Sequence, residues 1–144
     1  MNDRIDSVRQ RLDEGKFTCV LLTDREEYTS YERGVKPLLS LLESRKSFIG
    51  AVAADKTVGA GAAHLYVLLG VRALWANMVI TAALKVFKEN GIEIHYAERV
   101  PYIINRKGDG VCPIETAVKE VWDSKEAYRV IVETLGKLAM KKIN

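Results

Sequence analysis

The 144-residue sequence has few of the residues that build metal modules and covalent scaffolds. It contains two cysteines and two histidines, and Cys19 and Cys112 lie far apart with no CxxC pair or Cys/His cluster near either. This pattern excludes the sequence-local zinc modules and a disulfide framework, and it favours a reducing cytoplasm. No apolar stretch approaches the ~18 residues that cross a bilayer, and the N-terminal segment is charged throughout. We therefore expect a soluble, cytoplasmic protein that is not exported.

The sequence also lacks a strong excess of charge of either sign. Its 22 basic and 19 acidic residues give a formal net charge of +3, and no basic stripe is interleaved with aromatic residues. This balance predicts no nucleic-acid partner and no membrane partner. The hydrophobic fraction of 48% is enough for a real core. With no internal repeat and no linker, residues 1–144 are expected to form one domain.

The spacing of apolar residues predicts strands that alternate with helices. In chain order we expect a helix over 3–14, a hairpin of strands over 17–22 and 28–31, a helix over 35–42, a strand over 48–54, a helix over 61–69, a strand over 73–76, a helix over 81–88 and a strand over 92–96. Two C-terminal helices are expected to follow, one over 112–122 and one that starts at 123 or 124. Strands and helices that alternate at short connections are typical of βαβ units, whose strands are parallel. The predicted fold class is therefore α/β.

The first candidate site is the segment AADKTVGAGAA, in which a buried strand is expected to end at Asp55 and Lys56. Gly59 and Gly61 precede the next helix, and an open helix N-terminus beyond a parallel strand can bind an anion. The segment carries only a GxG, without GxGxxG or GxxxxGK[ST], so the signal is weak. The alternative is that the glycines let the helix lie close to the sheet, with Asp55 and Lys56 in a solvated turn.

The second candidate site is the segment NRKGDGVCPIE. Pro113 suits the first helical position, Cys112 then falls at the N-cap, and Glu115 can reach back to the backbone N–H of the cap. A thiol at a helix start near basic residues is a setting for a nucleophile, although the Glu115 carboxylate opposes its ionisation. Cys112 could be structural, contact a ligand or form a covalent intermediate, with Asn105 and Arg106 orienting the substrate.

The two histidines do not indicate a metal site. His64 lies in an apolar helical pattern and His95 in an alternating strand, so both are expected to be ordinary half-buried side chains. A zinc site needs three or four convergent ligands, which no local motif supplies. We expect neither a metal nor another cofactor.

Three phrases, YERGVKPLLSLL, AADKTVGAGAA and RVPYIINRKGDGVCPIETAV, resemble a bacterial family of unknown function with the cytidine-deaminase-like fold. The resemblance covers about residues 17–121. It implies a three-layer fold in which a mixed sheet, made of an antiparallel hairpin and parallel strands, is flanked by helices. Zinc deaminases of this fold open one helix with H-A-E and a later one with P-C-x-x-C. Here those openings read GVKP and GAGAA, so the resemblance implies a protein that is not a zinc-dependent deaminase.

The same resemblance implies that the two helix openings point into one depression, with Lys36 and Lys56 at its rim. Lysines and unpaired amides suit a small anionic ligand, such as a phosphate or a nucleotide-like molecule. The candidate ligand-binding residues are Lys36, Asp55, Lys56, Gly59, Gly61, Asn105, Arg106 and Glu115. Two alternatives stay open: a group-transfer enzyme that depends on Cys112, and a homo-oligomeric or protein-interaction module that uses the apolar face of the last helix.

Overall fold

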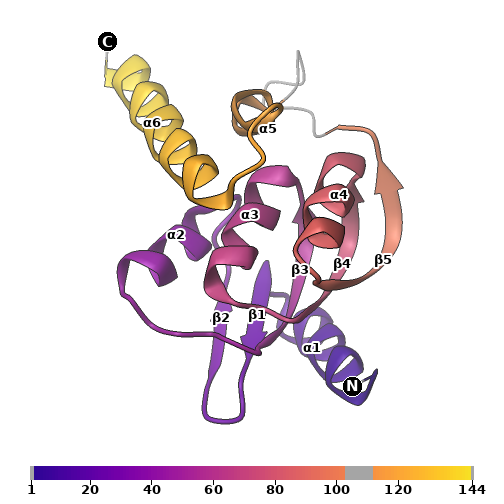
Figure 1. Ribbon diagram of the computed structural model, residues 1–144. Helices are drawn as coiled ribbons and strands as arrows, with labels where there is room; N and C mark the ends of the chain where they lie inside the picture. The colour runs from indigo at the N-terminus through magenta and orange to yellow at the C-terminus, as the bar shows by residue number, and fades with distance from the viewer. Residues whose placement is uncertain (1, 103–111, 144) are drawn as a thin grey trace.

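The computed structural model describes residues 2–102 and 112–143, with side chains described for residues 4–102 and 112–140. The elements follow one another as α1 (Asn2–Gly15), β1 (Cys19–Leu22), β2 (Glu27–Ser30), α2 (Lys36–Glu43), β3 (Val52–Val58), α3 (Ala60–Leu69), β4 (Ala73–Ile80), α4 (Thr81–Glu89), β5 (Glu93–Val100), α5 (Pro113–Val118) and α6 (Ser124–Ile143). Figure 1 shows these elements along the chain. The order and type of every element agree with the pattern expected from the sequence.

The strands form one mixed sheet in the order β2-β1-β3-β4-β5. β1 pairs antiparallel with both β2 and β3, whereas β3, β4 and β5 are parallel. The parallel half follows from the helices that connect its strands, because a parallel pair needs a crossover connection. The prediction of an antiparallel hairpin joined to parallel strands is confirmed.

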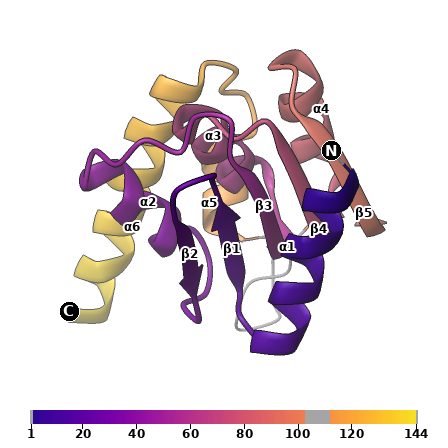
Figure 2. The same cartoon turned by 90° about the horizontal axis from the view of Figure 1, so that it is seen from below.

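Helices cover both faces of the sheet, which makes three layers. α1 lies on one face, and α2, α3 and α4 lie on the other (Figure 2). The inner side of α1 is a stripe at helical spacing, Ile5, Val8 and Leu12, that is buried against Val52 and Trp75 of the sheet. The opposite layer centres on α3, whose alanines and Gly61 are buried between the sheet and the C-terminal helices.

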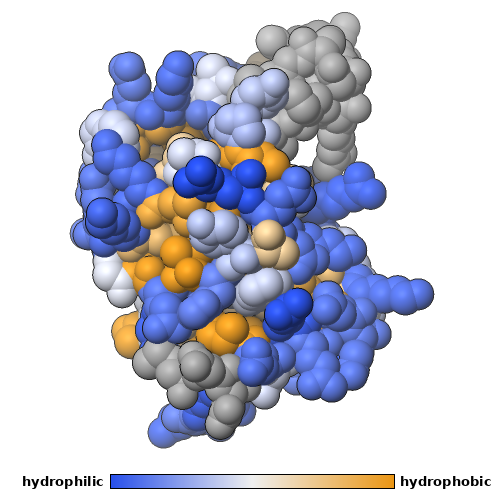
Figure 3. Space-filling model, turned by 90° about the vertical axis from the view of Figure 1, so that its right-hand side faces the viewer, coloured by the Kyte–Doolittle hydropathy of each residue, from blue (hydrophilic) through white to orange (hydrophobic). Residues whose placement is uncertain are grey.

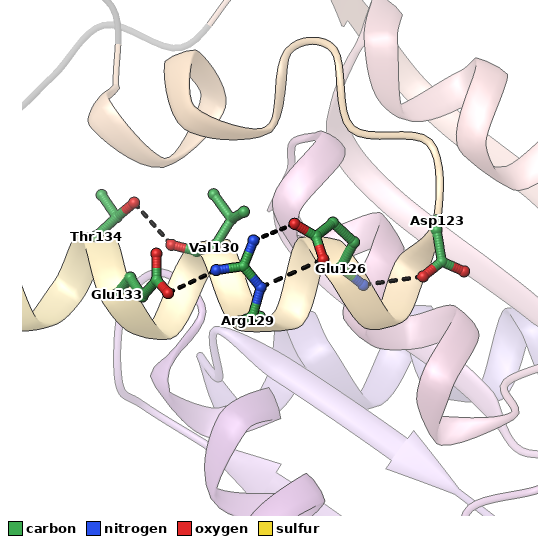
Figure 4. A network of polar contacts seen from close by, with 6 residues as sticks. All are labelled: Asp123, Glu126, Arg129, Val130, Glu133 and Thr134. Atoms are coloured by element: carbon green, nitrogen blue, oxygen red, sulfur yellow. Dashed lines mark hydrogen bonds and ion pairs between the residues drawn. The ribbon is translucent and has the colours of Figure 1, made fainter.

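The C-terminal helix α6 packs across α3 and carries a surface ion-pair network. Its first turn is capped where the backbone N–H of Glu126 donates to Asp123 Oδ2 over 3.0 Å. Arg129 pairs with Glu126 and with Glu133, one helical turn to either side (Figure 4). The opposite side of the helix buries Ile131 fully in the core, as the apolar spacing predicts.

The strand before the opening of α3 lies further along the chain than expected, at Val52–Val58 instead of 48–54. β3 continues through Val58 because its last residues still pair with β4, where Thr57 lies opposite Met78. Asp55 and Lys56 are therefore strand residues: the strand does not end at them as predicted, and the alternative that they form a solvated turn is wrong. The helix expected from Cys112 to Trp122 is also shorter, since α5 ends at Val118.

Exposed apolar side chains are interspersed with polar ones on the face over α4 and β5. Figure 3 shows hydrophobic residues on this face in separate areas between hydrophilic side chains. Among the helices in the described part of the chain, none is both long enough and apolar enough to cross a membrane.

Candidate functional site

The openings of α2 and α3 meet at a pocket of about 480 Å³, which we call the cleft. It is lined by Thr18, Cys19, Glu32, Arg33, Gly34, Val35, Pro37, Leu38, Asp55, Lys56, Thr57, Gly59, Ala62, Cys112, Ile114 and Glu115. The strand ends of β1 and β3 supply its floor, the two helix starts supply its sides, and α5 closes one wall. The structure thus brings together six sequence-predicted site residues: Asp55, Lys56, Gly59, Cys112, Glu115 and, directly behind the Glu115 carboxylate, Gly61.

The N-terminus of α3 is already occupied by an anion from the chain itself. The backbone N–H groups of Ala60 and Gly61 donate to the two carboxylate oxygens of Glu115, over 2.7 and 3.0 Å. A carboxylate at this position satisfies two unpaired amides and opposes the positive end of the helix dipole. Glu115 therefore caps a distant helix, and the expectation that it reaches back to its own helix start is wrong.

The glycines of GAGAA make room for this contact. A Cβ atom on Gly59 would lie 2.5 Å from the carboxyl carbon of Glu115, and one on Gly61 would lie 2.7 Å from Cγ2 of Ile114. Both distances are too short for any side chain without a shift. The GxG spacing is thus explained by the approach of α5.

The opening of α2 has no such cap. Val35 is at the N-cap position without a side-chain hydrogen bond to the helix, and Pro37 lies in the first turn. Arg33 lines the cleft beside this opening, while Lys36 is exposed next to it. Among the described residues, neither Arg33 nor Lys36 has an ion-pair partner. Arg33 and Lys36 therefore place two cations without an ion-pair partner among the described residues at the α2 side of the cleft, where Glu32 adds one negative charge.

Asp55 forms the deep polar end of the cleft. Its Oδ2 accepts a hydrogen bond of 2.6 Å from the hydroxyl of Tyr66, a side chain with no exposed surface. Its Oδ1 accepts from the backbone N–H of Thr57 over 3.3 Å. Burial of the carboxyl raises the pKa of Asp55 to about 7, because these hydrogen bonds offset the loss of hydration only in part. Near neutral pH this carboxyl can hold or release a proton.

Strand alternation separates Lys56 from Asp55. Ala54 packs on the α1 face and Asp55 contacts α3, so Lys56 follows on the α1 face. The exposed Lys56 side chain thus starts on the face opposite the Asp55 carboxyl, while the residue lines the end of the cleft.

Both cysteines line the cleft, although they are far apart in the sequence. Cys19 is buried on β1, directly across from Asp55 in the β1–β3 pair, and burial raises the pKa of its thiol. Cys112 is half-buried at the N-cap of α5, as predicted. Both thiols are free.

Neither histidine lines the cleft. His64 is fully buried, whereas a half-buried position was expected, and its ring joins α3 to the start of α6. Its Nε2 lies 3.1 Å from the carbonyl oxygen of Val121 and its Nδ1 lies 2.9 Å from the hydroxyl of Ser124. The carbonyl can only accept, so Nε2 carries the proton and Nδ1 accepts from Ser124. His95 is half-buried on β5, where it contacts Glu93.

The donors in the cleft do not suit a zinc ion. Zinc needs at least three convergent nitrogen, sulfur or oxygen ligands, and no group of three His, Cys, Asp or Glu side chains in residues 4–102 and 112–140 is arranged to hold a metal. The Glu115 carboxylate is bound by α3 amides and the Asp55 carboxyl by Tyr66. The predicted residues Asn105 and Arg106 lie outside the described residues.

Sequence reasoning did not place Tyr66 or Thr57 in the site. Thr57 could have been found from strand alternation, because it shares a face with Asp55 once β3 is extended. Tyr66 sits in an apolar helix whose pattern predicts core packing, and only the packing of α3 on β3 brings its hydroxyl to Asp55.

Comparison with known proteins shows a family that matches most of the chain. The family described as TM1506, Domain of unknown function (DUF1893), matches residues 7–135. The crystal structure of a DUF1893 family protein (TM1506) from Thermotoga maritima is 24% identical, with a TM-score of 0.84 over 92% of this chain and 90% of that one. No curated protein matches the chain.

Two deaminases are weaker structural neighbours. A diaminohydroxyphosphoribosylaminopyrimidine deaminase/5-amino-6-(5-phosphoribosylamino)uracil reductase from Thermotoga maritima is 10% identical, with a TM-score of 0.46 over 81% of this chain and 41% of that one. The dCMP deaminase of the cyanophage S-TIM5 is 11% identical, with a TM-score of 0.43 over 69% of this chain and 95% of that one. The match over residues 7–135 shows that the chain belongs to the DUF1893 family of domains of unknown function.

Proposed function

We propose that the cleft binds a small ligand that carries an oxyanion, such as a phosphate ester. The observation that carries the proposal is the uncapped start of α2 beside Arg33, which lines the cleft without an ion-pair partner among the described residues. Unpaired helix amides and a guanidinium both favour a tetrahedral oxyanion. The volume of about 480 Å³ is within the range of small-molecule sites.

The start of α3 supports the proposal, because an anion already binds the backbone N–H groups there. There, Glu115 supplies the carboxylate that the helix N-terminus favours. At α2 the N-cap side chain makes no hydrogen bond to the helix, and Pro37 has no N–H, so the first-turn donors are the N–H groups of Lys36 and Leu38. A ligand oxyanion at α2 would oppose the positive end of this helix dipole, as Glu115 does at α3.

The test is a titration with inorganic phosphate and nucleoside 5′-monophosphates, read by thermal shift and calorimetry. We expect stabilisation that Arg33→Ala lowers strongly and Lys36→Ala lowers less, since loss of a charged hydrogen-bond donor costs roughly tenfold in affinity. Lys88→Ala is the matched control, because Lys88 is exposed in the last turn of α4 and does not line the cleft. The absence of any response to these anions would overturn the proposal.

A second candidate function is group transfer through Cys112. It is favoured by the position of this thiol at a helix start that lines the same cleft. The test measures the rate at which iodoacetamide alkylates Cys112 at a series of pH values. The Cys112→Ser variant is the control, because any alkylation that remains in it comes from Cys19. If Cys112 reacts no faster than a free thiol at neutral pH, this function is excluded.

Self-association is a further proposal for the C-terminal region. Trp122, Val132 and Met140 are exposed by 54%, 43% and 65%, and the latter two lie on α6. Size-exclusion chromatography with light scattering tests it, because a strict monomer would remove a homo-oligomer.

A further inference from the structure

The Asp55 carboxyl lines the cleft with little exposure to solvent. Its two oxygens accept from Tyr66 and from the backbone of Thr57, and its cross-strand neighbour is the buried Cys19. No ion pair between Asp55 and a cation occurs among the described residues. The neighbouring Lys56 side chain starts on the other face of the sheet. A carboxyl in this position pays a large cost when it ionises.

Each element around Asp55 presents a defined group to it. From α3 the Tyr66 hydroxyl donates, and from β1 the Cys19 thiol lies across the strand pair, next to Tyr28 of β2. Burial raises the pKa of Cys19 and of Tyr66, so thiol and phenol are neutral at pH 7. From α5 the carboxylate of Glu115 faces the α3 amides. The loop before α2 adds Glu32 and Arg33, which line the cleft, and β3 itself adds Lys56.

We propose that Asp55 is the specificity residue of the cleft: it donates its proton in a hydrogen bond to an oxygen of the bound oxyanion, so that binding takes up a proton. This inference rests on the proposed function. A protonated carboxyl has one O–H to donate, whereas an ionised one is an acceptor only and repels an anion. Oδ2 is engaged by Tyr66 in either state, which holds the carboxyl in one orientation toward the cleft.

Sulfate is the probe that separates the protein's titration from the ligand's, because its charge stays constant between pH 6 and 8. With the pKa of Asp55 at about 7, the protonated fraction falls about tenfold from pH 6 to pH 8, and the affinity for sulfate should fall about tenfold with it. Calorimetry in two buffers of different ionisation enthalpy should report uptake of about half a proton at pH 7.

The matched variant is Asp55→Asn, which is neutral at every pH and keeps an N–H donor. It should bind sulfate with the same affinity at pH 6 and pH 8 and without proton uptake. Sulfate that binds the wild type equally well at both pH values would overturn the inference and leave the proposed function standing. The absence of both sulfate and phosphate binding at both pH values would overturn the inference and the proposed function together. If Asp55→Asn does not fold, the proton count of the wild type decides, because a value near zero at pH 7 refutes the role of Asp55.

Discussion

Removal of the Glu115 carboxylate tests the unexpected link between α5 and α3. In Glu115→Ala two charge-assisted hydrogen bonds disappear, to the N–H groups of Ala60 and Gly61. Loss of an N-cap acceptor costs about 0.5–2 kcal/mol, and hydrogen bonds to charged groups are worth about 1.5–3 kcal/mol each. Because Glu115 is half-buried, we expect a loss near the lower end, about 3 kcal/mol of the free energy of unfolding.

The assay is chemical denaturation together with thermal melting. For a domain of this size about 3 kcal/mol corresponds to roughly 10 °C in Tm. Glu115→Gln keeps one acceptor but turns an NH₂ group toward the second amide, so it should recover less than half of the loss. Glu120→Ala is the control, because Glu120 is exposed and has no ion pair with another described residue.

Two further measurements show whether the loss of stability arises at the start of α3. Amide exchange of Ala60 and Gly61 should accelerate in Glu115→Ala, and phosphate should restore part of the lost Tm by binding to the freed helix start. If Glu115→Ala is no less stable than Glu120→Ala and the two amides exchange at wild-type rates, the capping assignment is wrong.

Three predictions concern stability. Asp55 binds its proton more tightly in the folded state, with a pKa of about 7 against 3.8. Urea denaturation of Asp55→Asn should therefore show a gain over wild type that grows between pH 4 and 7, up to about 4 kcal/mol. Burial lowers the pKa of His64 below 6.5, so wild-type stability should fall below pH 6.5, and His64→Gln should remove that part of the fall. Gly61→Ala should cost about 1–3 kcal/mol in the same assay, because its Cβ would meet Ile114; the exposed Gly136→Ala should gain up to about 1 kcal/mol. A Gly61→Ala protein that is at least as stable as Gly136→Ala would contradict the packing assignment. A pH dependence of stability that Asp55→Asn or His64→Gln leaves the same as in the wild type would contradict the pKa assignment of that residue.

The fold could be predicted because its signals are local. Ile5, Val8 and Leu12 recur at helical spacing. Glycines separate one element from the next, as Gly70 does where it ends α3 at φ +84°. Such patterns record which face each element buries, and short connections then leave few possible topologies. The strand ends were less predictable, since Lys56 and Thr57 join β3 through pairing with β4.

The candidate site could be predicted only in part. The chain alone located the helix openings, placed Cys112 at an N-cap and singled out Asp55 and Glu115, because residue type and position carry that information. It could not say that Glu115 caps α3, because the two partners lie 54 and 55 positions apart and α5 must first pack on α3. The proton affinity of Asp55 is likewise absent from the sequence, since it depends on burial beside Tyr66. Local patterns determined the elements; tertiary packing decided which helix start is filled and which carboxyl can hold a proton.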